Sequence, residues 1–197
     1  MSQFSCVVMG NESLLVQCSE KLIGAGHDIR AVVTRNAGIA EWAQGRGLAV
    51  IAPGTGLADR LPGAFDWLLS ISNLDMIPRA VLALPAKGAV NFHDGPLPRH
   101  AGLNAPVWAL IEGETRHGIT WHMIEGGVDE GDILVSRGFD VSGNDTALTL
   151  NTKAYEAAID SFDDLMDQLA QGLRRVPQDL GQRSYHALAD RPSGHGL

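Results

Sequence analysis

The fold is indicated by the start of the chain, residues 4–34, FSCVVMGNESLLVQCSEKLIGAGHDIRAVVT. Its first seven residues are mostly apolar and predict a buried strand that ends at Gly10. A helix follows, with Asn11 as its expected N-cap. Its apolar face is made by residues spaced four apart, Leu14, Cys18 and Leu22. Residues 27–34 return to strand composition, so the stretch predicts the strand, helix and strand from which parallel α/β sheets are built.

The same alternation continues to residue 171. Further strands are expected over residues 48–53, 65–72, 89–93, 118–125 and 132–141, and further helices over 38–46, 105–112 and 146–171. This order predicts an α/β fold, an open, mostly parallel twisted sheet with helices on both faces, of the Rossmann-like kind. Residues 1–170 are expected to form one domain. Residues 171–197 are expected to form a polar C-terminal tail or linker, because the periodicity ends there and the last residues read PSGHGL.

Composition excludes several classes of protein. The 197 residues are 45% hydrophobic and 19% charged, which is ordinary for a globular chain. The formal charge of −8 argues against nucleic acid as a partner, because binding phosphates needs an excess of Lys and Arg. No apolar run is long enough to span a membrane, and the N-terminus lacks the pattern of a signal peptide. A cytoplasmic protein is therefore expected, with Cys6 and Cys18 as buried thiols.

The chemistry is indicated by polar residues at the end of the strand over residues 89–93. Asn91 and His93 are two residues apart, so their side chains leave the same face of that strand. Ligands of open α/β sheets bind beyond the carboxyl ends of the strands. An amide and an imidazole at this point can donate hydrogen bonds to an oxygen that becomes negative during acyl transfer. Asp129 lies in a glycine-rich loop and could orient the imidazole and favour its protonated form.

Other histidines offer a weaker interpretation. His93, His100, His117, His122 and Asp129 could include metal ligands, but none of their spacings is typical of a metal site, so no metal is expected. His100 and His117, with His186 and His195, are expected at the surface. Trp121 and His122 alternate on a strand near the site, and either could face it. The tryptophans in apolar segments, Trp42, Trp67 and Trp108, are expected in the core.

Two segments carry a resemblance to a known family. NFHDGPLP, residues 91–98, followed by Gly102, resembles the N-x-H-x-S-L-L-P…G stretch of the 10-formyltetrahydrofolate-dependent formyltransferases. GITWHMIEGGVDEGDIL, residues 118–134, resembles that family's segment ending in D-x-G-D-I-L. The likeness extends over most of residues 4–170, which would then be a formyltransferase catalytic domain.

The resemblance implies roles for particular residues. Asn91, His93 and Asp129 take the places of the family's catalytic Asn, His and Asp. Two segments take the places that bind the folate cosubstrate, 10-formyltetrahydrofolate, and they contribute Leu74, Asp75, Met76 and Ile77 from one and Ile124, Gly127 and Val128 from the other. No metal is implied. Asp94 and Gly95 depart from the family's usual Pro and Ser, and Leu74 from its usual Gly or Met.

The acceptor of the formyl group is the least determined part of the expectation. The sequence HDGPLP and the polar tail most resemble the formylation domain found at the start of some nonribosomal peptide synthetases. The partners would then be an aminoacyl group on a carrier domain and further synthetase domains downstream. A tail of 27 residues is short for the second domain of methionyl-tRNA formyltransferase. The alternatives are a sugar-nucleotide or other small-amine N-formyltransferase, a formyltetrahydrofolate hydrolase and a non-catalytic docking module.

Overall fold

The computed structural model describes residues 2–190, which fall into two units. The first unit contains the chain up to Asn91 and the segment Met166–Gly172. The second contains Phe92–Leu165 and the described residues from Leu173 onward. The two units are described separately below.

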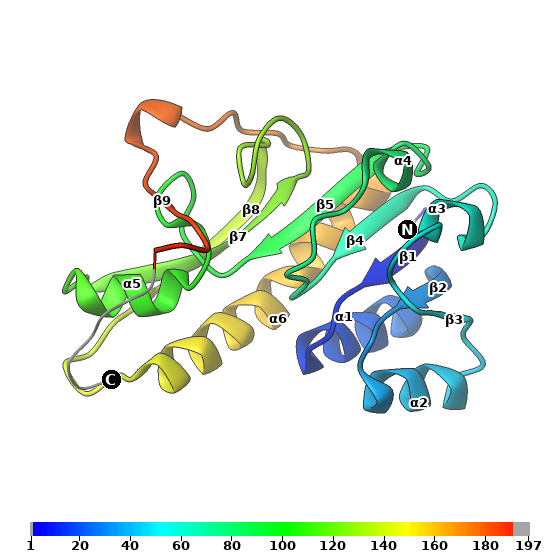
Figure 1. The fold of residues 1–197 in the computed structure, drawn as a ribbon, viewed down its shortest axis with the longest axis horizontal. Helices are drawn as coiled ribbons and strands as arrows, with labels where there is room; N and C mark the ends of the chain where they lie inside the picture. Colours follow the sequence, from blue (N-terminus) through cyan, green and yellow to red (C-terminus); the bar gives the residue numbers. More distant parts are fainter. Residues whose placement is uncertain (1, 191–197) are drawn as a thin grey trace. The chain divides into compact units, whose positions relative to one another are not determined.

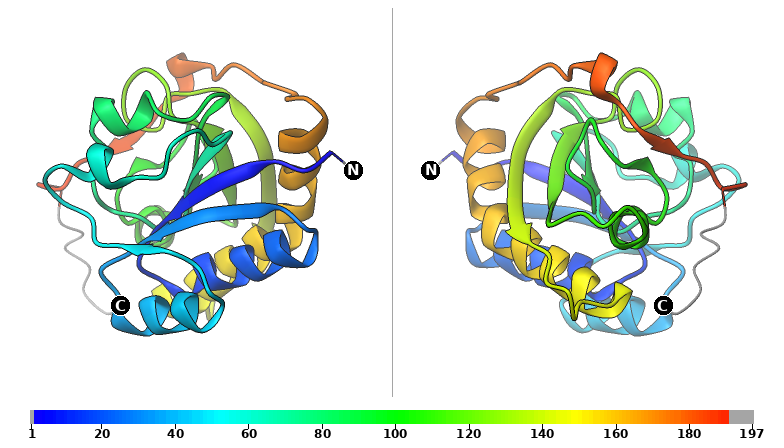
Figure 2. Two further views of the ribbon diagram at one scale, coloured as in Figure 1. Left: turned by 90° about the vertical axis from the view of Figure 1, so that its right-hand side faces the viewer. Right: turned by 90° about the vertical axis from the view of Figure 1, so that its left-hand side faces the viewer.

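The first unit is made of parallel strands and the helices that connect them (Figure 1). Its strands are β1 (Ser5–Met9), β2 (Asp28–Val33), β3 (Val50–Ile51), β4 (Trp67–Ser70) and the first part of β5 (Gly88–His93). Its helices are α1 (Ser13–Gly24), α2 (Ala37–Gly45), α3 (Leu57–Arg60) and α4 (Arg79–Leu82). The strand order is β3-β2-β1-β4-β5, and every pair is parallel. Because chain progression reverses its direction across the sheet after β3, α1 and α2 lie on one side of these strands and α3 and α4 on the other (Figure 2).

The core of the first unit is formed where α1 packs on β1 and β2. Strand β1 has four consecutive buried residues, which is typical of a strand covered on both faces. The fully buried positions include Val7, Val8, Leu14, Leu22 and Leu68. Cys6 and Cys18 are buried and form no disulfide, as the sequence predicted.

The start of α1 differs from the sequence prediction. The cap position is Glu12, whose side chain makes no capping hydrogen bond, and not Asn11. The side-chain oxygen of Asn11 instead accepts hydrogen bonds from the Thr34 hydroxyl, at 3.3 Å, and the Arg35 amide, at 2.9 Å. Asn11 therefore ties the end of β1 to the end of β2.

The second unit is built around an antiparallel pair of strands (Figure 1). Its elements are β6 (Ala101–Gly102), α5 (Ala105–Ile111), β7 (Arg116–Met123), β8 (Ile133–Asp140), the 3₁₀ helix η1 (Leu180–Gln182), β9 (Tyr185–His186) and most of α6 (Ala147–Gln171). The apolar face of α6 is the one that the sequence predicted, and its residues Leu150, Ala154, Ala158, Phe162 and Leu165 are fully buried. With β7 and β8 added after β5, the sheet has seven strands. This confirms the expected open, mostly parallel α/β fold.

The segment that follows α6 contributes to the second unit. Val176 forms an isolated antiparallel bridge with Ile133 at the start of β8, and β9 pairs in parallel with β6. Gly102 permits the pairing of β6 with β9, because its φ is +92° and a Cβ there would lie 2.2 Å from the His186 carbonyl oxygen. The linker expected at PSGHGL lies outside the described residues. Among residues 2–190, no helix is long and apolar enough to span a membrane.

Candidate active site

Asp129 is the most densely contacted residue of the predicted site. Its carboxylate is 10% exposed, and Oδ2 accepts a hydrogen bond of 2.9 Å from the Gly102 amide. Oδ1 lies 3.3 Å from His122 Nε2, and Oδ2 lies 3.6 Å from His93 Nδ1. Burial alone would raise the pKa of Asp129, but the hydrogen bond with His122, the charge of His93 and the Gly102 amide outweigh it and lower this pKa to about 2. Asp129 is therefore an anion at any physiological pH.

His93 ends β5, and its ring is 5% exposed. Its Nε2 lies 2.8 Å from the carbonyl oxygen of His100, so this nitrogen donates and the carbonyl accepts. Nδ1 is then the ring atom that faces the carboxylates of Asp129 and Asp94, at 3.6 and 3.9 Å. Both separations exceed a direct hydrogen bond and leave Nδ1 able to reach a substrate oxygen or a bridging water.

Asn91 lies two residues before His93 on the same strand, at a half-buried position paired with Ser70 of β4. Strand geometry directs side chains two residues apart to the same face. Asn91 belongs to the first unit and His93 to the second. Their relation is therefore given only by their positions on β5. The pair His93 and Asp129, by contrast, is brought together directly.

Asp94 is a group that the sequence interpretation did not assign to catalysis. Its Oδ1 is 3.9 Å from His93 Nδ1, and its side chain is one-third exposed. Desolvation raises the pKa of Asp94, the charge of His93 opposes this, and the charge of Asp129 adds to it. Two carboxylates thus face one imidazole edge with pKa values displaced in opposite directions, which is the arrangement of a fixed anion beside a group that can exchange a proton.

The backbone around His93 is strained. His100, Asn104 and Asp129 have φ values of 56°, 59° and 55°, in the left-handed region that non-glycine residues rarely adopt. Strain of this kind persists where surrounding contacts hold the chain in place, and it is concentrated at functional sites. Gly95 lies in the same crowded region. A Cβ at this position would lie 2.7 Å from His93 Nε2, so a residue with a side chain would not fit without a shift.

Residues from the C-terminal segment hold the loop that carries Asp129. Gln178 Nε2 donates to the carbonyl oxygens of Asp129, at 2.8 Å, and of Gly131, at 2.7 Å. Arg183 donates to the Val128 carbonyl oxygen at 2.9 Å. These contacts join residues about 50 positions apart, and no local sequence pattern signals them.

His122 is the member of the Trp121 and His122 pair that faces the site. The register of β7 and β8 shifts between these two residues, and such an irregularity redirects a side chain. Trp121 packs instead in the core beside Phe92 and Phe162. The expected surface position is wrong for His100 and His117, which are 1% and 3% exposed, and for His186, whose side chain is 12% exposed. His195 lies outside the described residues.

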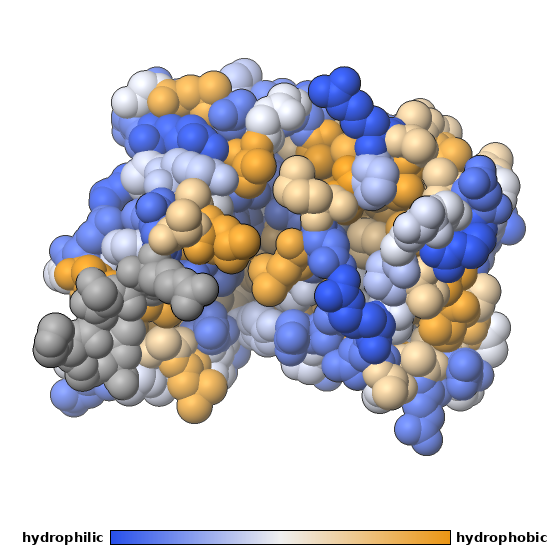
Figure 3. Space-filling model, in the orientation of Figure 1, coloured by the Kyte–Doolittle hydropathy of each residue, from blue (hydrophilic) through white to orange (hydrophobic). Residues whose placement is uncertain are grey.

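The residues expected to bind folate occupy two loops, one in each unit. In the first unit, Leu74 and Met76 are highly exposed, at 85% and 81%, and Asp75 forms an ion pair with Arg35. Asp75 and Met76 line a groove of about 550 Å³ beyond the carboxyl ends of β1 to β4. Figure 3 shows hydrophobic residues gathered over α4 on this face. In the second unit, Ile124 and the more exposed Gly127 and Val128 lie in the loop that carries Asp129.

The expectation that three tryptophans lie in the core is confirmed for only one of them. Trp67 is buried, and its indole nitrogen donates to the Leu169 carbonyl oxygen. Trp42 and Trp108 are only half-buried. Trp42 donates to Glu20, which explains why its ring stays near the surface.

Comparison with known proteins identifies the class of α/β protein to which the chain belongs. The sequence profile of the formyl transferase family matches residues 65–162, about half of the chain. The chain is 27% identical to methionyl-tRNA formyltransferase of Geobacter metallireducens over 98% of this chain and 68% of that protein. It is 33% identical to GDP-perosamine N-formyltransferase of Brucella melitensis over 62% of this chain and 47% of that protein. The chain belongs to the formyl transferase family.

The fold itself is shared with solved structures. The structure of an N-formyltransferase from Helicobacter canadensis, in complex with folinic acid and dTDP-3-aminofucose, superposes with a TM-score of 0.82 at 18% identity. The match covers 99% of this chain and 74% of that one.

Proposed function

We propose that this protein transfers the formyl group of 10-formyltetrahydrofolate to a primary amine, with Asn91, His93 and Asp129 as its catalytic residues. The observation that carries the proposal is the placement of His93 Nδ1 at 3.6 Å from Asp129 Oδ2, with Nε2 already engaged by the His100 carbonyl. A ring that donates from Nε2 has a hydrogen on Nδ1 only when it is protonated. Asp129 faces that nitrogen and orients the ring.

The chemical step would use these groups as follows. The lone pair of the amine attacks the formyl carbon, and negative charge develops on the formyl oxygen. The Asn91 amide and the Nδ1–H of His93 donate to that oxygen, and stabilisation of this kind is worth about 10²–10³ in rate for each donor. Asp129 holds the charge and orientation of His93 and remains ionised.

Proton transfer completes the step. The attacking amine must lose a proton, and the folate nitrogen must gain one before the bond to the formyl carbon breaks and the electron pair leaves with that nitrogen. Asp94 suits the first transfer better than Asp129, because its pKa is raised and that of Asp129 is lowered to about 2. Asp94 would take the proton from the amine, directly or through a water, and pass it on to the folate nitrogen, so no net proton is consumed.

Folate would be held by the two loops that carry the predicted contact residues. In the first unit the loop Leu74–Ile77 offers exposed apolar side chains next to the groove that Asp75 and Met76 line. In the second unit Ile124, Gly127 and Val128 flank Asp129 in sequence. Support comes also from the Helicobacter canadensis structure, which contains folinic acid.

For the acceptor, we favour an amino sugar carried on a nucleotide. Support comes from the 33% identity to GDP-perosamine N-formyltransferase and from the fold shared with an enzyme crystallised with dTDP-3-aminofucose. The 27% identity to methionyl-tRNA formyltransferase over nearly the whole chain makes charged tRNA the second candidate. The carrier-bound aminoacyl group rests only on sequence, on HDGPLP and the polar tail.

One assay separates these acceptors and the remaining alternatives. The protein is incubated with 10-formyltetrahydrofolate and, in separate reactions, a nucleotide-linked amino sugar, methionyl-tRNA, an aminoacyl carrier protein or no acceptor. Tetrahydrofolate release and the mass of each acceptor are followed. We expect one formyl group on the amino sugar.

Each other outcome contradicts part of the proposal. Formylation of tRNA or carrier protein alone would replace the acceptor but keep the reaction. Formate release without any acceptor would indicate a hydrolase. No folate turnover in any reaction would favour the non-catalytic docking module and contradict the proposed activity.

A further inference from the structure

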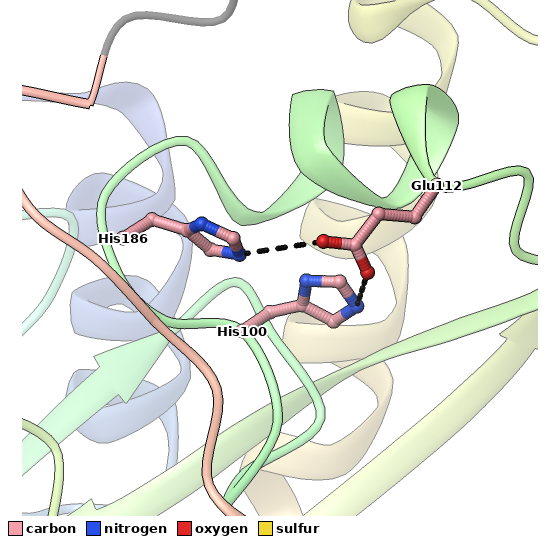
Figure 4. Close-up of side chains that lie close together, drawn as sticks. All are labelled: His100, Glu112 and His186. Atoms are coloured by element: carbon pink, nitrogen blue, oxygen red, sulfur yellow. Dashed lines mark ion pairs between the residues drawn. The ribbon is translucent and has the colours of Figure 1, made fainter.

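A second cluster of polar side chains lies behind His93, on the side of its Nε2. It consists of His100 before β6, Glu112 after α5 and His186 on β9 (Figure 4). His100 Nε2 is 3.9 Å from Glu112 Oε2, and His186 Nε2 is 3.8 Å from Glu112 Oε1. The three ligand atoms all lie within 4.8 Å of one another. Both rings therefore point at one carboxylate.

Burial makes this cluster unusual. The His100 side chain is 1% exposed and that of His186 is 12% exposed. His186 Nε2, the atom directed at Glu112, is buried without a hydrogen-bond partner among the described residues. Buried polar atoms almost always have a hydrogen-bond partner, so one without a partner calls for a ligand or a function.

The rings are held in place before any ligand arrives. Trp108 stacks on His186 with ring centres 4.3 Å apart and planes 8° apart. The His100 ring also stacks on that of His186, at 5.7 Å and 23°.

Charged neighbours do not exclude a cation. Arg99 Nη2 is 3.8 Å from Glu112 Oε2, but its close ion pair is with Glu114. Glu114 Oε1 also lies 3.6 Å from His100 Nε2. With Glu114 balancing Arg99, the charge of Glu112 remains for the two rings and a bound ion.

We propose that His100, Glu112 and His186 bind one Zn²⁺ ion, with water as its fourth ligand. Two imidazoles and one carboxylate are a known ligand set for four-coordinate zinc. Ligands at about 2.0–2.1 Å from a tetrahedral ion lie roughly 3.4 Å apart. The three ligand atoms lie within 4.8 Å of one another, so the widest separation would have to contract by at most about 1.4 Å, which side-chain rotation can supply.

The proposed ion would act at a distance on His93. His186 belongs to the strand that pairs with β6, and the backbone carbonyl of His100 accepts the hydrogen bond from His93 Nε2. A zinc ion at this point would fix both β9 and the residue that holds His93. It would thus be a positioning site and not part of the chemical step.

The test is titration of the metal-free full chain with Co²⁺, a coloured substitute for Zn²⁺, followed by competition with Zn²⁺. We expect one Co²⁺ per chain with the visible absorption of tetrahedral cobalt, bleached by one equivalent of Zn²⁺. H186Q and E112Q should each weaken binding at least tenfold, since even removal of a group that merely orients a ligand costs 10–100-fold. Far-UV circular dichroism checks that each variant folds.

Two matched controls are available. H27Q removes a histidine of the first unit and keeps the cluster, and Y185F changes the residue beside His186. Both should bind Co²⁺ as the unmodified chain does. The proposal is overturned if the unmodified chain gives no saturable tetrahedral spectrum, or if folded H186Q and E112Q bind as tightly as H27Q. Either result can be obtained without any formyl acceptor, so it is independent of the proposed activity.

Discussion

The two loops predicted to meet the folate are built in opposite ways. In the loop Leu74–Ile77, Leu74 and Met76 are more than 80% exposed, and the ion pair of Asp75 with Arg35 is at the surface. In the other loop, Asp129 is 10% exposed and contacts Gly102 and two histidines, while Gln178 holds its backbone. A side chain that must orient a catalytic group needs a fixed position, whereas a surface that covers a flat ring needs apolar area. The difference suggests that one loop serves chemistry and the other binding.

Removal of the Asp129 charge should have the largest effect. Asp129→Asn keeps the size of the side chain but loses the anion that faces His93 and His122. We expect the single-turnover rate of formyl transfer to fall by about 10²–10⁴, the usual range for an acid–base or orienting group. Asp164→Asn, at an exposed carboxylate that pairs with Arg137, is the control and should keep the original rate. A normal rate in folded Asp129→Asn would contradict the assigned role.

Asp129 should also contribute to the pH dependence of the free energy of unfolding. A carboxyl whose pKa is lowered by folding, here from 3.8 to about 2, stabilises the fold above pH 4 and loses that contribution as pH falls toward 2. The shift corresponds to about 2 kcal/mol. The free energy of unfolding, measured with urea between pH 5 and pH 2, should therefore fall less steeply in Asp129→Asn than in the unmodified chain. Parallel curves would show that Asp129 is not held by these contacts.

Loss of Gln178 should loosen the loop that carries Asp129 without changing the side chains of that loop. Gln178→Ala leaves the carbonyls of Asp129 and Gly131 without their donor, at a cost of about 1–3 kcal/mol. Hydrogen exchange should speed up in residues 124–132, and kcat should fall with it. Gln182→Ala removes an exposed glutamine that bonds to Asp179 and should do neither. Unchanged exchange in Gln178→Ala would mean that the loop is rigid for another reason.

Changes in the exposed loop should act on binding alone. Met76→Ser and Leu74→Ser remove apolar area that is already exposed, so stability should change by no more than about 0.5 kcal/mol. If these side chains cover the folate, KM for 10-formyltetrahydrofolate should rise roughly tenfold with kcat retained. Leu148→Ser, at an equally exposed leucine on α6, is the control. An unchanged KM in both loop variants would remove this loop from the folate site.

The sequence was most informative where structure is local. Buried strands such as β1 and the apolar face of α6 follow from periodicity, and the position of His93 at the end of β5 follows from strand length. The cap at Asn11 was predicted wrongly. Its side chain instead accepts a hydrogen bond from a residue that follows β2, a contact that exists only once the sheet has formed. Local signals cannot report such partners.

The same limit explains what was missed at the site. His100 looked like a surface histidine because its surroundings come from α5, β7 and the distant β9. Gln178 lies in a polar segment without periodicity. Its role is to donate hydrogen bonds to backbone carbonyls almost 50 residues earlier, which the local sequence does not indicate. Asp94 was noticed only as a departure from the family pattern, and its proximity to His93 Nδ1 gave it a possible role.

The central claim is tested most directly by the rate of formyl transfer in Asn91→Ala and His93→Ala, with folate affinity measured on the same preparations. Each variant should lose about 10²–10³ in single-turnover rate. Each should keep the dissociation constant for folate within a few-fold, because neither residue lies in the loops assigned to folate. Transfer at the original rate in both folded variants would contradict the account.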